Sequence, residues 1–249
     1  MRLFLVVMAL ASVTFPRLAD AEDPVTSRLL TAPTAWLPPA NGVVVTTTLD
    51  HRFDGSAVVG YGLGGVGAID VGTDTDVRSC ATCDGDAEPI FLGRAGFRMG
   101  LGQDTLFRGM PAVLVGVRTT FASSGSARVR VSEAYAVASR ELGPLVFHGG
   151  AQAVDASADG DELGVTIKLI AGLEWTPGQY PNTTVIADFA HVPLIRTSTG
   201  PALEWVAGVG VRYLAFRDWG AIELGVRVRE DEGLGDTTVM IRLNGVFDP

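Results

Sequence analysis

The chain has 249 residues and a net charge of −9, with 19 Lys and Arg residues against 28 Asp and Glu residues. Nucleic-acid binding needs a basic patch, so this acidic composition excludes nucleic acid from the expected partners. The length allows one large β domain or two small ones after removal of a targeting segment.

Residues 1–21 have the pattern of a secretory signal peptide. Arg2 supplies a basic start, "LFLVVMALASVTF" supplies an apolar stretch, and the small residues "ADA" precede Glu22 as a cleavage site. The apolar stretch is shorter than the roughly 20 residues of a spanning helix. No later stretch approaches that length, so any membrane crossing must use strands.

After residue 41 the sequence alternates between apolar and polar residues with a period of two. The alternating runs are separated by Gly, Asp, Pro or Ser clusters, the pattern of regularly spaced antiparallel strands. In "VTIKLIAGLEW" one face is apolar, and the other carries Lys168, Gly172 and Glu174. We expect twelve strands, near 42–53, 55–63, 66–77, 88–99, 111–122, 127–139, 144–155, 164–176, 183–192, 202–216, 219–229 and 236–247.

The length of these runs favours a membrane barrel over a soluble sandwich. Strands of soluble sheets are most often about five or six residues long, whereas tilted membrane strands need roughly 9–11. Trp175, Trp205, Tyr213 and Phe247 lie near the ends of the apolar rows, as aromatic girdles do. We therefore predict an all-β, antiparallel, transmembrane up-and-down β-barrel of about 12 strands. A secreted soluble β-sandwich is the alternative.

The final strand and the segment before the first strand resemble those of outer-membrane β-barrel (porin-like) proteins of Gram-negative bacteria. There the last strand ends on an aromatic residue after alternating apolar ones, as "TTVMIRLNGVFDP" does with Val239, Ile241, Leu243 and Phe247, although two residues follow the aromatic. "LTAPTAWLPPANGVVV" (30–45) is similar to the stretch that precedes the first strand of several such barrels.

This resemblance implies a location in the outer membrane after secretion by the signal peptide. It also implies a periplasmic N-terminal segment at residues 22–41 and a β-barrel domain at 42–249. The expected surroundings are outer-membrane lipid and lipopolysaccharide. The expected partner is the barrel-insertion machinery, which reads the last strand, and the barrel is expected to be a monomer.

Cys80 and Cys83 form a C-x-x-C motif inside an acidic loop. A redox site would need a βαβ setting, which the sequence does not show. A zinc site would need two further Cys or His ligands. We therefore favour a small disulfide that tightens the loop, with metal binding, redox chemistry and free thiols as alternatives.

The sequence gives little indication of catalysis. The nucleophile motif G-x-S-x-G is absent, and His148 is expected on a polar strand face without a recognisable partner. The acidic loop residues Asp159, Asp161 and Glu162 could offer oxygen ligands to Ca²⁺, but solvated loop charge is the favoured interpretation. We expect neither an enzyme nor a cofactor nor a metal.

The polar faces of the strands carry the charges, because an Arg facing lipid costs about 2–4 kcal/mol at the bilayer centre. Arg128 and Arg130 are expected inside as well, but Glu133 then falls on the apolar face of the same run, which indicates a bulge or a shifted register. The candidate pore-lining residues are Arg94, Arg98, Arg118, Lys168, Glu174, Arg212, Glu223, Arg227 and Arg242.

Two functions are compatible with such a lumen. Opposite charges could pair and fill it, giving a non-conducting structural or adhesion barrel with acidic loops. Alternatively, the charges could line a water-filled pore and set its ion preference. A barrel of eight strands leaves no channel and a barrel of 16 leaves a wide one, so a count of 12 strands does not decide between these two functions. Lumen glycines such as Gly208, Gly210 and Gly225 favour open space, and hence a narrow channel for small polar or anionic solutes.

Overall fold

The computed structural model describes residues 28–51, 54–74, 77–79, 92–122, 128–196, 200–216, 219–230 and 237–247. The signal peptide expected at 1–21 and the candidate disulfide between Cys80 and Cys83 lie outside the described residues, so both stay predictions.

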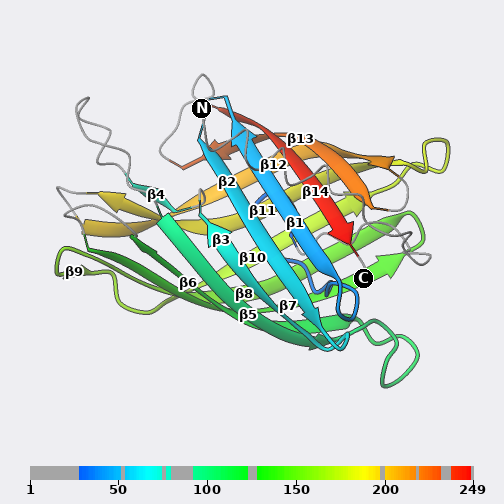
Figure 1. Cartoon of the computed structure of the whole chain (residues 1–249), viewed down its shortest axis with the longest axis horizontal. Helices are drawn as coiled ribbons and strands as arrows, with labels where there is room; N and C mark the ends of the chain where they lie inside the picture. Colours follow the sequence, from blue (N-terminus) through cyan, green and yellow to red (C-terminus); the bar gives the residue numbers. More distant parts are fainter. Residues whose placement is uncertain are drawn as a thin grey trace.

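The described residues form twelve long strands and two strands of two residues (Figure 1). The strands are β1 (Val43–Asp50), β2 (Gly55–Leu63), β3 (Gly67–Thr73), β4 (Arg78–Ser79), β5 (Leu92–Leu101), β6 (Ala112–Ala122), β7 (Val129–Leu142), β8 (Leu145–Ala158), β9 (Asp161–Glu162), β10 (Thr166–Trp175), β11 (Thr183–Arg196), β12 (Gly200–Phe216), β13 (Gly220–Arg229) and β14 (Thr238–Phe247). No helix among these residues is long and apolar enough to cross a membrane.

The twelve long strands close into one antiparallel barrel. Each pairs with the next long strand along the chain, and β1 pairs with β14 from Val43–Phe247 to Asp50–Met240. Closure leaves the sheet without a free edge strand at either chain end. The predicted all-β up-and-down barrel of twelve strands is therefore confirmed, and the soluble two-sheet sandwich is excluded.

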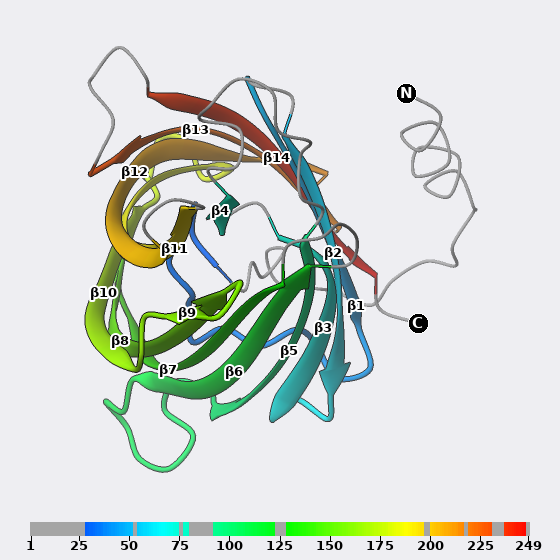
Figure 2. The ribbon, with the colours of Figure 1, turned by 90° about the vertical axis from the view of Figure 1, so that its left-hand side faces the viewer.

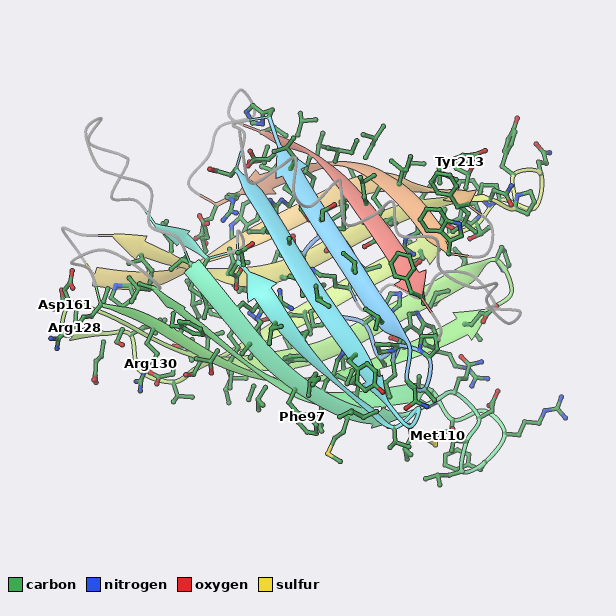
Figure 3. The ribbon with its side chains drawn as sticks, in the orientation of Figure 1. Phe97, Met110, Arg128, Arg130, Asp161 and Tyr213 are labelled. Carbon is green, nitrogen blue, oxygen red and sulfur yellow. The ribbon has the colours of Figure 1, made fainter. Side chains whose placement is uncertain are left out.

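The outer surface of the barrel is a belt of exposed apolar side chains. Side chains alternate between the two faces of each strand, and Phe97, Tyr213 and Leu224 are among the exposed apolar residues. Figure 3 shows Phe97 and Tyr213 pointing away from the wall. An apolar outside with charged residues inside is the pattern of a membrane-spanning barrel.

The last strand presents its predicted apolar row on this outer surface. Val239, Ile241 and Leu243 are exposed, whereas the residues between them are buried. The final aromatic, Phe247, stacks on Trp219, which immediately precedes β13, with ring centroids 6.0 Å apart. The strand therefore has the expected pattern, and its recognition by insertion machinery stays a prediction.

The register of β7 differs from the sequence expectation. Glu133 points into the barrel and pairs with Arg118, whereas Arg128 and Arg130 are exposed at one end of the barrel (Figure 3). The pairing of β7 with β6 and β8 has no register shift, so no bulge is present. Water can cover outward charges at the barrel end, whereas Glu133 lies deeper, where an outward carboxylate would face lipid.

The wall is incompletely paired between β10 and β11. These strands share five residue pairs, from Ala171–Phe189 to Trp175–Val185. Beyond them, residues 192–195 of β11 are all buried and part of this stretch pairs with β4, which lies inside the ring of long strands (Figure 2). The Gln152 side chain donates a hydrogen bond to a β11 carbonyl oxygen there. This end of β11 therefore narrows the lumen.

If the apolar belt faces the membrane, the stability cost of placing a charge on it should depend on the depth of the substituted residue in the bilayer. Leu224 is 58% exposed near the centre of β13, and Leu224→Arg should cost about 2–4 kcal/mol of stability in a bilayer. Val165 is 74% exposed just before β10, and Val165→Arg should cost about 1 kcal/mol or less there. Denaturant unfolding in lipid vesicles measures both. Equal costs at the two positions would contradict the membrane assignment.

Candidate functional site

The lumen contains the chain's own N-terminal segment. Residues 28–39, called the inner segment below, run through the interior before β1 begins (Figure 2). Leu29, Leu30, Ala32 and Ala35 of this segment are at most 3% exposed. Part of the segment expected at 22–41 therefore occupies the barrel interior.

Glycines on the inner wall leave room for the inner segment. A Cβ on Gly225 would lie 2.8 Å from Leu30 Cδ2, and one on Gly208 would lie 3.1 Å from Leu30 Cδ1. A Cβ on Gly172 would overlap Leu29. Complete burial of a Leu side chain stabilises by about 1.5–3 kcal/mol. The space that these glycines provide is thus filled by leucines, contrary to the open space expected from the sequence.

Two charged wall residues hold the backbone of the inner segment. The Asp188 carboxylate accepts hydrogen bonds from two successive N–H groups, and the Arg242 guanidinium donates to two successive carbonyl oxygens. All of these groups are buried, so each hydrogen bond replaces water that the interior excludes. The four bonds join Asp188 Oδ2 to Thr31 N at 2.5 Å and Ala32 N at 2.7 Å, and Arg242 to Leu29 O at 2.5 Å and Leu30 O at 2.6 Å.

A continuous series of side chains connects Arg242 to a third anchor on the opposite part of the wall. This series, called the polar chain below, has members on six strands from β14 to β7. It runs Arg242–Glu223–Arg212–Glu174–His148–Ser139 with successive distances of 3.0, 2.7, 2.7, 3.1 and 2.7 Å. It ends where Ser139 Oγ accepts a hydrogen bond from the Ala35 N–H at 2.8 Å.

Ser139, His148 and Glu174 have the residue types of a hydrolase triad, but their contacts indicate an anchor. Ser139 Oγ accepts from Ala35, and we assign the His148 ring proton to Nε2 because the Glu174 carboxylate there is an acceptor only, so that the Ser139 hydroxyl donates to Nδ1. Ser139 is fully buried beneath the inner segment, and Glu174 also pairs with Arg212. The serine hydroxyl thus faces backbone rather than solvent. The absence of enzymatic activity stays a prediction.

Space remains in the lumen mostly beside β1–β7, and it reaches residues of β8 and β11. Two adjoining small cavities have three arginines in common. These are Arg28, Arg94 and Arg98. Arg94 donates from Nε and Nη2 to Asp70 Oδ1 at 3.2 and 3.1 Å. Arg118 pairs with Glu133 at the second cavity.

The nine candidate pore-lining residues have separate environments in the structure. Four of them line a cavity, three belong to the polar chain, Arg227 is buried, and Lys168 is half-buried. Arg242 is both a cavity residue and a member of the polar chain. Whether any of them lines a conducting path stays a prediction. The four at a cavity are Arg94, Arg98, Arg118 and Arg242, and the three others in the polar chain are Glu174, Arg212 and Glu223.

Sequence reasoning missed the inner segment and Ser139 as site residues. One signal was present in "RLLTAPTAWL" (28–37), where apolar residues lie outside any predicted strand and must be buried somewhere. No comparable signal identifies Ser139, because a lone serine on an inward strand face is compatible with any lumen.

No protein-family model matches the sequence, and no curated protein matches it. Among solved structures, the fold is similar to a KdgM porin at 7% identity and a TM-score of 0.49, covering 84% of this chain and 99% of that one. Outer membrane phospholipase A from Escherichia coli is similar at 10% identity and a TM-score of 0.44, covering 85% of this chain and 98% of that one. The translocator domain of the autotransporter NalP from Neisseria meningitidis is similar at 12% identity and a TM-score of 0.39, covering 84% of this chain and 88% of that one.

Loss of the Asp188 carboxylate should loosen the inner segment. Asp188→Ala leaves the Thr31 and Ala32 N–H groups buried without acceptors, at about 1–3 kcal/mol each. Hydrogen exchange of residues 28–39 should accelerate about tenfold or more. The matched control is Asp155→Ala, because Asp155 forms only an exposed pair with Arg130. Unchanged protection in Asp188→Ala would contradict the anchor.

Ser139→Ala tests the far anchor of the same segment. The change removes the acceptor of the Ala35 N–H and the donor to His148, so exchange at Ala35 should accelerate and stability should fall by about 1–3 kcal/mol. Ser132→Ala on the same strand should change neither, because Ser132 points to the outer face. Labelling of Ser139 by a fluorophosphonate in the folded protein would show a reachable nucleophile and overturn the anchoring role.

Proposed function

We propose that this chain is an outer-membrane β-barrel that passes small anionic solutes through a narrow path beside its inner segment. The observation that carries this proposal is the charge of the two adjoining cavities. Five guanidinium groups and three carboxylates line them, and because Glu223 balances the charge of Arg242 in the polar chain, one positive charge is left in excess. Charges that line a pore set its ion preference. The groups are Arg28, Arg94, Arg98, Arg118 and Arg242 against Asp70, Asp74 and Glu133.

The proposed path follows the two cavities, which the polar chain borders at Arg242. The hydroxyl groups of Thr46, Thr48 and Ser56 line the first cavity together with the arginines. Hydroxyls and guanidiniums can replace the hydration of a small anion, whereas the apolar contacts of Leu29 and Leu30 exclude water on the other side. Small anions are therefore favoured over apolar solutes.

The proposed location rests on the outer surface of the barrel. A closed barrel with an apolar belt satisfies its backbone polar groups within a bilayer. Outer-membrane lipid and lipopolysaccharide are the proposed surroundings, a monomer is the proposed state, and the outward row of β14 is the proposed signal for the barrel-insertion machinery.

A non-conducting structural barrel is the second candidate. The polar chain and the buried leucines favour it, because together they fill the lumen beside β7–β14. The two candidates differ in one measurable property, which is the current through a single inserted barrel.

Conductance in planar bilayers under a KCl gradient tests the proposal. The reversal potential should have the sign of preferred chloride permeation. Arg28→Gln, which removes one positive charge from both cavities, should lower the chloride preference several-fold. The double variant Arg94→Gln with Asp70→Asn removes one charge of each sign and should leave the preference nearly unchanged.

Three results would contradict the channel. They are cation preference in the unmodified protein, equal selectivity in Arg28→Gln, and no current from barrels whose insertion is verified. The last result would favour the structural barrel. Arg212 is unsuitable for this test because it pairs with both Glu174 and Glu223, so its substitution would disrupt the wall.

A further inference from the structure

Arg98 lies where the two cavities meet and has no salt-bridge partner among the described residues, although Asp70 and Tyr135 interact with its guanidinium. It points inward from β5, is only 5% exposed, and lines both cavities. The nearby carboxylates serve other arginines: Asp70 accepts two hydrogen bonds from Arg94, and Glu133 pairs with Arg118. Among the described residues, no carboxylate forms a salt bridge with Arg98.

The Arg98 side chain also has an unused hydrogen-bond donor. Its Nε is buried and has no partner among the described residues. A buried donor without an acceptor costs about 1–3 kcal/mol, and more when the group is charged. Beside a cavity, such a donor can be satisfied by an acceptor that arrives from solution, either water or an anion.

The surroundings of Arg98 are shaped by small residues. Its cross-strand partners are Ala68 on β3 and Gly116 on β6, and a Cβ built on Gly60 would lie 3.9 Å from Arg98 Nη2. Tyr135 lines the second cavity beside it. The planar guanidinium therefore has small neighbours on β2, β3 and β6, while the Tyr135 side chain contacts it and leaves its other donors toward the cavities. Arginine binds carboxylate and phosphate groups through two parallel N–H donors.

We propose that Arg98 forms the centre of a binding site for a small oxyanion, a free carboxylate or phosphate solute, inside the barrel. Arg94 and Arg28 line the same junction; Asp70 balances the charge of Arg94, and Arg28 adds positive charge beside the bound anion. This proposal rests on the proposed function, because the Arg98 site is the place where a permeating anion would pause. The site can nevertheless bind an anion in a barrel that does not conduct.

Inorganic phosphate is the probe, and binding is measured by titration calorimetry on the full-length mature protein refolded in detergent. The unmodified barrel should bind phosphate saturably in a 1:1 complex. Arg98→Met should weaken binding about tenfold or more, the effect of losing charge-assisted hydrogen bonds. Arg98→Lys keeps the charge without the planar fork and should bind with intermediate affinity. Arg130→Met is the matched control, because Arg130 lies on the outer surface.

Folding and conduction are separated from binding in this design. The gel mobility of unboiled samples verifies that each variant is folded, and Arg98→Lys keeps the test decisive if Arg98→Met does not fold. Equal phosphate affinity in the unmodified and Arg98→Lys barrels, or no saturable binding, would overturn the site. Phosphate binding without conductance would retain the site and reject the channel. Anion conductance without phosphate binding would retain the channel and reject the site.

Discussion

The lumen beside β7–β14 depends on the hydrogen bonds between buried wall charges and the backbone of the inner segment. Arg242 pairs with Glu223 but also needs acceptors for its remaining N–H groups, which the carbonyl oxygens of the segment supply. Asp188 receives N–H groups from the same segment. An unpaired buried charge is far more costly than a paired one. The wall and the segment therefore stabilise each other, and neither arrangement is favourable without the other.

The inner segment divides a twelve-stranded lumen into two unlike parts. Beside β7–β14, leucines pack into positions where the wall has glycines, and the polar chain satisfies its own charges. Beside β1–β7 space remains, and the arginines that line it outnumber the carboxylates once Arg28 of the inner segment is counted. Twelve strands lie between eight, whose wall side chains fill the interior, and sixteen, which leave a channel, so wall side chains and lumen volume need not match. A length of backbone resolves this mismatch because it fills volume on one side only.

The sequence predicts the barrel well because alternation has a direct physical cause. Each outward residue in a membrane strand faces lipid, so rows such as Val239, Ile241 and Leu243 are visible without a structure. The register of β7 is wrong in the prediction because its first charges, including Arg130, lie beyond the belt, where the rule for lipid-facing charge no longer applies. The site is less predictable. Which arginine meets which carboxylate depends on the curvature of the wall, and the glycines around Leu30 have the same sequence signature whether their space is open or filled.

The polar chain also determines how the inner segment can leave the lumen. Its members bind the segment at Leu29, Leu30 and Ala35, so the ends of the buried stretch are connected through the wall as well as through the backbone. Release at one end would leave polar chain members without partners and weaken the other end, since hydrogen-bonded networks are lost cooperatively. Water could enter from the cavity side and hydrate the freed groups, which would limit the cost. Removal of the segment should thus be one concerted step rather than gradual fraying, and the cavity beside β1–β7 is the side from which water would begin it.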